Sequence, residues 1–191
     1  SAILHALYKE RQRKVHLREL SRETGMYGQS ISRYLNVLEK KKILKSEREG
    51  NLKKYSLIQS LEVYAILTVF DVERVQKWPL LRRQAIATYL HALPCLPIFG
   101  VVFGSTAKET FREDSDIDIL IVTQEKTDTR KAEKEVNAIN AITISTFQMT
   151  YQKFMKELKL KEDKVVQSAI ETGLPIINHV HYYEVLDHER I

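Results

Sequence analysis

Apolar residues in the first sixty positions recur at helical spacing and then give way to the alternation of strands. Residues 2–9, 15–25 and 26–44 each place apolar side chains three or four positions apart, which predicts three helices. Gly25 is expected to stop the second helix in a left-handed conformation. Residues 44–58 predict two short strands around Gly50 and Asn51, which both tolerate positive φ in a tight turn. This part of the chain is therefore predicted to form three helices and a hairpin.

The charge of the chain is concentrated in the same segment. The whole chain has a net charge of +5, but residues 1–58 hold 14 Lys and Arg against 6 Asp and Glu, a net +8. The remaining residues hold 16 against 19, a net −3. Clustered cations favour a polyanion as partner, because counterions are released on binding to nucleic acid. A basic surface that is simply well solvated is the alternative.

The order of helices and hairpin over residues 15–58 resembles a winged helix-turn-helix domain. In that family the third helix enters the major groove and the wing tip touches the DNA backbone or the minor groove. The resemblance implies double-stranded DNA as a partner and a role in transcription regulation. A protein-interaction module is the alternative, against which the local positive charge argues. The DNA-binding residues implied are Gln29, Ser30, Ser32 and Arg33 on the helix, with Arg48, Asn51 and Lys53 on the wing.

Residues 60–93 predict two linking helices. Residues 61–77 are apolar nearly all round in their first half, which suits burial between domains or in a dimer interface. Pro79 is expected to end or kink this helix before a second one over residues 80–93. Because DNA-reading winged helices often pair to match a two-fold operator, a homodimer is one hypothesis. The expected domains are residues 1–59, 60–93 and 94–191.

Several classes of protein do not fit the composition. The longest apolar run, residues 63–70, is far shorter than the roughly 18 residues that cross a bilayer, and no export pattern opens the sequence. We therefore expect a cytoplasmic protein without a membrane partner. Cys95 is the only cysteine, which excludes an internal disulfide and a multi-cysteine zinc site.

Residues 103–122 contain the pattern with the clearest chemical meaning. An apolar run over residues 98–103 predicts a strand, residues 106–111 a short helix, and residues 116–122 a second strand. Alternation along that strand places Asp116 and Asp118 on one face, about 6 to 7 Å apart along the backbone. Two such carboxylates repel each other unless a cation lies between them. Mg²⁺ or Mn²⁺ would suit them, because hard divalent cations prefer oxygen ligands and commonly bind phosphates too.

The turn before the short helix is suited to a phosphate group. Gly104 has no Cβ, so the backbone can approach an anion closely, and the Ser105 hydroxyl adds a donor. Lys108 is a further candidate phosphate contact, although a solvated helical lysine is the alternative. The turn and the paired aspartates together predict a site for a nucleotide and a metal ion.

The Gly-Ser pair, the ten residues after it and the Asp-x-Asp pattern resemble the DNA polymerase β-like nucleotidyltransferases, specifically their minimal branch. The resemblance extends over about residues 96–186. It implies an α+β domain with a small mixed sheet and flanking helices, and transfer of a nucleoside monophosphate from an NTP to a hydroxyl, with release of pyrophosphate. In this reaction Asp116 and Asp118 would hold the metal ions and be catalytic, and Gly104 and Ser105 would hold the terminal phosphates.

One residue of the family pattern is missing. Active members usually place a third carboxylate on the next strand, but residues 141–147 contain no acid, and Thr143 or Ser145 occupies its place. Three explanations remain open. Another acid such as Glu113, Asp114 or Asp163 swings in; a substrate or partner supplies the ligand; or transfer is lost and nucleotide binding remains.

The last part of the chain is expected to contain two helices, one starting at Thr150 and one ending at Gly173, and a terminal strand over residues 175–186. His179 and His181, two apart on that strand, lack a third metal ligand and are expected to be ordinary edge residues.

Two functions follow from these patterns. The first is a DNA-binding transcription regulator whose nucleotidyltransferase-fold domain binds an NTP with Mg²⁺. The alternative is an active minimal nucleotidyltransferase that modifies a protein or RNA, as this branch does when it acts as antitoxin to a paired toxin. A protein-interaction scaffold is a third hypothesis.

Overall fold

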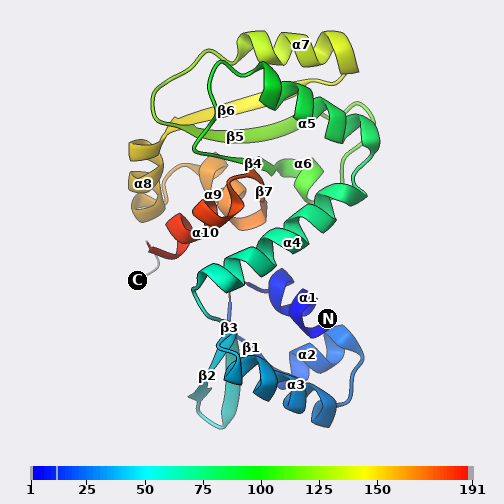
Figure 1. Ribbon diagram of the computed structural model, residues 1–191, viewed down its shortest axis with the longest axis vertical. Helices are drawn as coiled ribbons and strands as arrows, with labels where there is room; N and C mark the ends of the chain where they lie inside the picture. The colour runs from blue at the N-terminus through cyan, green and yellow to red at the C-terminus, as the bar shows by residue number, and fades with distance from the viewer. Residues whose placement is uncertain (1, 12, 189–191) are drawn as a thin grey trace. The chain divides into compact units, whose positions relative to one another are not determined.

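The computed structural model describes residues 2–11 and 13–188, whose helices and strands are drawn in Figure 1. The chain divides into two compact units, residues 1–70 and residues 71–191. Helix α4 (Leu61–Lys77) contains the boundary. No helix in the described ranges combines the length and the apolar character needed to cross a membrane.

The first unit contains three helices and a small antiparallel sheet. The helices are α1 (Ala2–Lys9), α2 (Leu17–Thr24) and α3 (Gly28–Lys40), and the strands are β1 (Val15–His16), β2 (Leu44–Glu49) and β3 (Leu52–Leu57). The strand order is β1-β3-β2. Gly25 and Gly50 have φ values of 66° and 59°, so the predicted helix stop and hairpin turn are confirmed.

The second helix begins later than its apolar spacing predicts. Val15 and His16 form β1 and pair with Tyr55 and Lys54 of β3, so α2 begins at Leu17. Val15 is nonetheless buried, in the cluster that fills the first unit. The buried residues of that cluster are Ile3, Ala6, Leu7, Val15, Leu20, Ile31, Leu35, Leu38, Leu44 and Tyr55.

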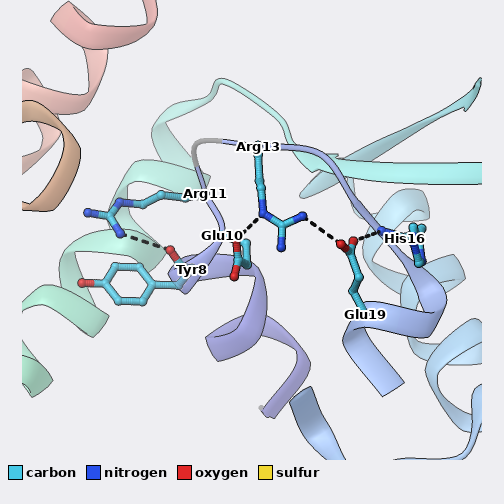
Figure 2. A network of polar contacts seen from close by, with 6 residues as sticks. All are labelled: Tyr8, Glu10, Arg11, Arg13, His16 and Glu19. Carbon is cyan, nitrogen blue, oxygen red and sulfur yellow. Dashed lines mark hydrogen bonds and ion pairs between the residues drawn. The ribbon is translucent and has the colours of Figure 1, made fainter. Parts of the chain in front are cut away.

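A polar network holds the connection between α1 and α2 (Figure 2). The backbone N–H of His16 donates to Glu19 Oε2 at 2.9 Å, and Arg13 Nη1 donates to Glu19 Oε1 at 3.0 Å. Arg13 also bonds Glu10, so one guanidinium joins the end of α1 to the first turn of α2. The bond from His16 N, followed by those from Arg13, lowers the pKa of Glu19. Because these ion pairs are exposed, each stabilises the unit by about 1 kcal/mol or less.

The second unit is built on a four-stranded mixed sheet. Its strands are β4 (Phe99–Phe103), β5 (Ile117–Thr123), β6 (Ile144–Thr150) and β7 (Leu174–Ile177), in the order β6-β5-β4-β7. β5 and β6 are parallel, and the other pairs are antiparallel. The helices are α5 (Leu80–Ala92), α6 (Gly104–Ala107), α7 (Arg130–Asn140), α8 (Tyr151–Leu160), α9 (Lys164–Thr172) and α10 (His179–His188). The α+β architecture expected from the sequence is confirmed.

Helices cover both faces of this sheet. α5 and α7 lie over one face, and α8, α9 and α10 over the other (Figure 1). Ile117 and Ile119 of β5 are buried in one cluster with Ala85 of α5 and Val136 of α7. On the opposite face, Phe99 of β4 meets the rings of Phe154 and Tyr182 edge to face, at 5.1 and 5.5 Å. The sheet is thus buried on both sides, which leaves strand ends as the places where polar side chains can gather.

The predicted terminal strand over residues 175–186 is wrong beyond its first three residues. β7 ends at Ile177, Asn178 has a φ of 53°, and α10 begins at His179. Tyr182, Val185 and Leu186 are buried at helical spacing, so packing under the sheet selects the helix. The structure also has helix α7, which the sequence patterns did not predict, and β6 begins at Ile144, three residues later than the strand expected there.

Candidate functional site

The Gly-Ser turn and the Asp-x-Asp pattern meet where β4 ends and β5 begins. Phe103, the last residue of β4, pairs with Asp118 in the antiparallel register of the two strands. Gly104 follows Phe103 directly, so strand pairing brings it beside Asp118 although the residues are far apart in sequence. Asp116 lies immediately before β5 and is exposed, whereas Asp118 is half-buried.

Gly104 is the residue that makes this close approach feasible. Its φ of 65° is left-handed, a conformation that L side chains rarely adopt. A Cβ at this position would overlap the Asp118 carboxylate, with Oδ2 as the nearest atom. Glycine is therefore required here both by the backbone conformation and by the space that the carboxylate occupies.

The two carboxylates influence each other electrostatically. Burial raises the pKa of Asp118, and the negative charge of Asp116 raises it further. Both causes disfavour the ionised form of Asp118 in the folded protein. The site therefore concentrates negative charge in a partly desolvated place, where a cation would relieve the repulsion.

The other residues predicted for nucleotide binding lie on the short helix after the turn. Ser105 is half-buried, and its carbonyl accepts a hydrogen bond from Thr110 N at 3.0 Å. Lys108 caps the end of α6 and is exposed. Gly104, Ser105, Asp116 and Asp118 therefore belong to one end of the sheet, with Lys108 at the entrance of the loop that follows.

Ser145 is the residue of the next strand that lies beside Asp118. β6 runs parallel to β5, and its register pairs Ser145 with Asp118. Thr143, the other position considered, precedes β6, and its carbonyl accepts a hydrogen bond from Ile117 N at 2.9 Å. The neighbouring strand thus contributes a hydroxyl at the position where a third carboxylate was expected.

The substitute acids considered from the sequence have other surroundings. Asp163 is the N-cap of α9, and its carboxylate accepts from Val165 N and Val166 N at 2.9 and 3.2 Å. Glu113 and Asp114 are exposed in the loop before β5. Within residues 2–11 and 13–188, no three His, Cys, Asp or Glu side chains are grouped as metal ligands.

His179 and His181 lie on helix α10 and not on a strand, which corrects the expected placement of this pair. Burial lowers the pKa of His179 despite its hydrogen bond with the backbone of Pro175. The ring of His181 stacks on Tyr151 at 6.1 Å. The two side chains therefore serve packing.

Two arginines that the sequence patterns did not single out hold the loop between α6 and β5. Arg82 of α5 is 3% exposed, and its guanidinium donates to Thr106 Oγ1, Arg112 O and Ser115 O. Arg74 of α4 donates to Ala107 O at 2.7 Å. A signal for Arg82 was present, because it stands in the buried stripe of α5 at helical spacing from Ala85, Ile86 and Tyr89.

In the first unit, the predicted DNA-binding residues are divided between α3 and the β2-β3 hairpin. Gln29, Ser30 and Arg33 are exposed on α3 while Ser32 is half-buried. Arg48 and Asn51 are exposed on the hairpin, and Lys53 forms an ion pair with Glu39 at 3.2 Å. Strand pairing places Arg48 opposite Lys53.

Most of the excess positive charge of this unit lies on and after α3, and Arg18 and Arg22 of α2 add to it. All six acids of residues 1–58 form ion pairs, with Arg13, Lys9, Lys14, Lys53 and Lys54 as partners. No ion-pair partner is present, within the ranges that the structure describes, for a second group of exposed cations. This group consists of Arg18, Arg22, Arg33, Lys40, Lys41, Lys42, Lys45 and Arg48. Tyr27, 87% exposed just before α3, is an aromatic neighbour that the sequence patterns missed.

Comparison with protein families identifies the domain that contains the carboxylate site. Residues 96–182 match the family model of the nucleotidyltransferase domain. The matched range includes Gly104, Asp116, Asp118 and all four strands of the second unit. Searches of curated proteins and of solved structures with the chain gave no match. Residues 96–182 of the second unit are therefore similar to nucleotidyltransferase domains.

Asp118→Asn is expected to raise the melting temperature at pH 7 by a few degrees when no divalent cation is added. The pKa of Asp118 is raised in the folded protein, so its carboxylate destabilises the fold above that pKa, and the penalty disappears below the unfolded value of 3.8. Calorimetry across this pH range measures the difference from the wild type.

The difference is expected to shrink as the pH falls through the folded pKa of Asp118 towards 3.8. Asp114→Asn, which removes an exposed carboxylate of the same loop, is the matched control and should leave the melting temperature nearly unchanged. An Asp118→Asn variant that is less stable than the wild type at pH 7 would contradict the electrostatic account of the site.

Proposed function

We propose that this protein is a DNA-binding regulator whose nucleotidyltransferase domain binds an NTP together with Mg²⁺ or Mn²⁺. The observation that carries the proposal is the fit of Gly104 against the Asp118 carboxylate, with Asp116 beside it. A partly buried pair of carboxylates without a counter-charge costs free energy. A bound cation would offset this cost, and we infer that the site holds a cationic ligand.

The residues present suit a hard divalent cation. Asp116 and Asp118 would hold it, because both offer carboxylate oxygens from one end of β5. Bound there, the metal ion would neutralise the carboxylates and join them to the phosphates of the nucleotide. The Asp118 carboxylate fills the side of Gly104 that a Cβ would occupy, so a phosphate would have to approach the backbone from elsewhere. The Ser105 hydroxyl would donate to the phosphate, and Lys108 would add a positive charge at the loop.

Ser145 favours nucleotide binding over transfer. A hydroxyl beside Asp118 carries no charge at neutral pH, is a weak ligand for Mg²⁺ and cannot accept the proton of an attacking hydroxyl as a carboxylate can. In this proposal the chain keeps the NTP and uses its presence as a signal. Transfer of a nucleoside monophosphate to a protein or RNA, with a toxin as partner, is the alternative, which the match to the nucleotidyltransferase family favours.

DNA binding is proposed for the first unit on the basis of its topology and charge. Three helices followed by an antiparallel hairpin are the arrangement of a winged helix-turn-helix, in which the third helix enters the major groove. The unpaired cations of α3 and β2 supply the positive surface that the phosphate backbone requires. A two-fold operator would make a second copy of this chain the natural protein partner.

The nucleotide proposal predicts Mg²⁺-dependent binding that Asp116→Asn weakens. With the full chain, each of the four NTPs is titrated with and without MgCl₂ by isothermal calorimetry. The wild type is expected to bind at least one of them only with Mg²⁺, and Asp116→Asn to lose about tenfold or more in affinity, since it removes one of two metal ligands. Asp114→Asn should bind as the wild type does.

The same proteins are then incubated with α-labelled NTPs, Mg²⁺ and candidate RNA and protein acceptors. Mg²⁺-dependent binding without label on any acceptor supports the regulator, whereas label that disappears in Asp116→Asn supports the transferase. If no NTP binds under any of these conditions, the nucleotide proposal is wrong.

Ser145→Asp is expected to increase the affinity for Mn²⁺. The register of β5 and β6 places the new carboxylate beside Asp118, where it would complete a three-acid site. Electron paramagnetic resonance of free Mn²⁺ measures the affinity directly, and about a tenfold gain is expected from an added carboxylate ligand. Ser145→Asn, of similar size without charge, is the control, and equal affinities of the two variants would contradict this placement.

The DNA proposal predicts binding that weakens steeply with salt. Mixed-sequence duplex DNA is expected to be retarded in a gel at low ionic strength. The double variant Arg33→Ala with Arg48→Ala should have a slope of log K against log salt that is smaller by about 2, since each lost phosphate contact removes about one counterion. Lys131→Ala, an exposed cation of the other unit, is the control for lost charge. Equal slopes for all three proteins would overturn the assignment.

A further inference from the structure

The segment between α6 and β5, residues 108–116, joins the two halves of the carboxylate site. It begins after the Gly104-Ser105 turn and ends at Asp116. Its backbone makes local hydrogen bonds, such as Thr110 N to Ser105 O at 3.0 Å and Ser115 N to Arg112 O at 3.1 Å. Most of its side chains are exposed, so little apolar burial holds it in place.

Arg82 anchors the middle and the end of this segment to the fold, whereas Arg74 forms an ion pair with Glu109 near its start. Arg82 Nη2 donates to the carbonyls of Arg112 and Ser115, both at 2.8 Å. Its Nη1 donates to Thr106 Oγ1 at 3.0 Å, and its guanidinium lies 4.1 Å from the ring centre of Phe111. One planar group therefore joins Thr106 of α6 to the middle of the segment and to Ser115, one residue before Asp116.

The guanidinium is buried among neutral acceptors. Thr106 offers a hydroxyl, and Arg112 and Ser115 offer carbonyl oxygens. Burial lowers the pKa of Arg82, and the negative charge of Asp116 raises it. A buried charge without a bonded carboxylate lowers the stability of a protein. The presence of Arg82 in the apolar stripe of α5 is therefore not explained by stability, which points to another role. The fork of donors, which lysine lacks, suits this role.

The two aspartates are held by different means. Asp118 lies within β5, where its strand pairs on both sides with Phe103 and Ser145. Asp116 lies outside the strand, and Ser115, the residue before it, is held by Arg82. The position of Asp116 relative to Asp118 therefore depends on how well the segment is anchored.

We propose that Arg82 is a positioning residue of the metal and nucleotide site, which fixes Asp116 for joint binding of a divalent cation with Asp118. This inference rests on the proposed function. Arg82 acts through the backbone of the segment and does not itself contact the ligand.

Arg82 has two opposite effects on the affinity of the site for a cation, and mutation can separate them. Its positive charge near Asp116 competes with a bound cation, whereas its hydrogen bonds order the segment that carries Asp116. If charge were the main effect, Arg82→Met would bind metal more tightly and Arg82→Lys would bind as the wild type does. If positioning dominates, both variants bind more weakly, because neither keeps the three-point fork.

The experiment uses the full chain and Mn²⁺ as the probe, followed by electron paramagnetic resonance without nucleotide. Both Arg82→Lys and Arg82→Met are expected to lose about tenfold in Mn²⁺ affinity, the size of effect typical when a residue that orients a ligand is removed. The control is Arg83→Met, the neighbouring arginine of α5, which donates to Trp78 O and Gln76 Oε1 and does not bond the segment. Its Mn²⁺ affinity should match that of the wild type.

Hydrogen exchange followed by mass spectrometry provides a readout that needs no ligand. Peptides covering residues 108–116 should exchange faster in both Arg82 variants and at wild-type rates in Arg83→Met. Peptides from β4 and β5 should keep their protection, which separates local loosening from unfolding. If Arg82→Met does not fold, Arg82→Lys, which keeps the buried charge, carries the test alone.

The outcomes distinguish this inference from the proposed function. A wild type that does not bind Mn²⁺ without nucleotide overturns the positioning role, whereas the proposed function is overturned only if the NTP titrations with Mg²⁺ also show no binding. A wild type that binds, with Arg82 variants of equal or higher affinity, overturns the positioning role and leaves the proposed function standing. Weaker binding in both variants, with faster exchange confined to the segment, supports the positioning role.

Discussion

The antiparallel pairing of β4 with β5 is the constraint on which the candidate site depends. Because Phe103 pairs with Asp118, the turn that leaves β4 must pass beside the carboxylate that enters β5. Only a residue without a Cβ, in a left-handed conformation, fits between them, and Gly104 meets both demands. Ile117 and Ile119 of β5 are buried against α5 and α7, so a slip of the register would disrupt this packing. The position of the carboxylate is thus fixed by the core of the domain.

The charged residues of the site lower the stability of the second unit, and the packing of the rest of that unit compensates for this. Asp118 is disfavoured as an anion by its burial and by Asp116, and Arg82 is buried with neutral acceptors. Neither arrangement would be expected from stability alone, since replacing buried charges by apolar groups is often neutral or stabilising. Both are understandable if the end of the sheet has to present two carboxylates to a cation in a fixed geometry. The helices and strands around it supply the stability that the site itself does not.

The parts of the fold that could be predicted are those whose signal is local. The helices of the first unit follow apolar spacing, α2 ends at Gly25, and the hairpin turns at Gly50. Both glycines have a left-handed φ, which glycine adopts readily. The alternation of apolar and polar residues after Gly173 suggested a strand over residues 175–186. Contacts between residues distant in sequence, such as that of Tyr182 with Phe99, select helix α10 instead. Arg82 was missed for the same reason, because its acceptors lie 24 to 33 positions away along the chain. The pairing of Ser145 with Asp118 likewise needed the parallel register of β5 and β6.

The number of acids at the site bears on what the domain can do with a nucleotide. In-line displacement at two metal ions requires ligands for both, and one of them must also favour loss of the proton from the acceptor hydroxyl. Asp116 and Asp118 together neutralise a single divalent cation, which is the charge that accompanies an NTP in solution as its Mg²⁺ complex. With a hydroxyl at Ser145, a second cation would have only the nucleotide and water to bind it. A site with this charge would be better matched to holding the complex than to splitting it, and that match is the physical argument for the proposed role in sensing.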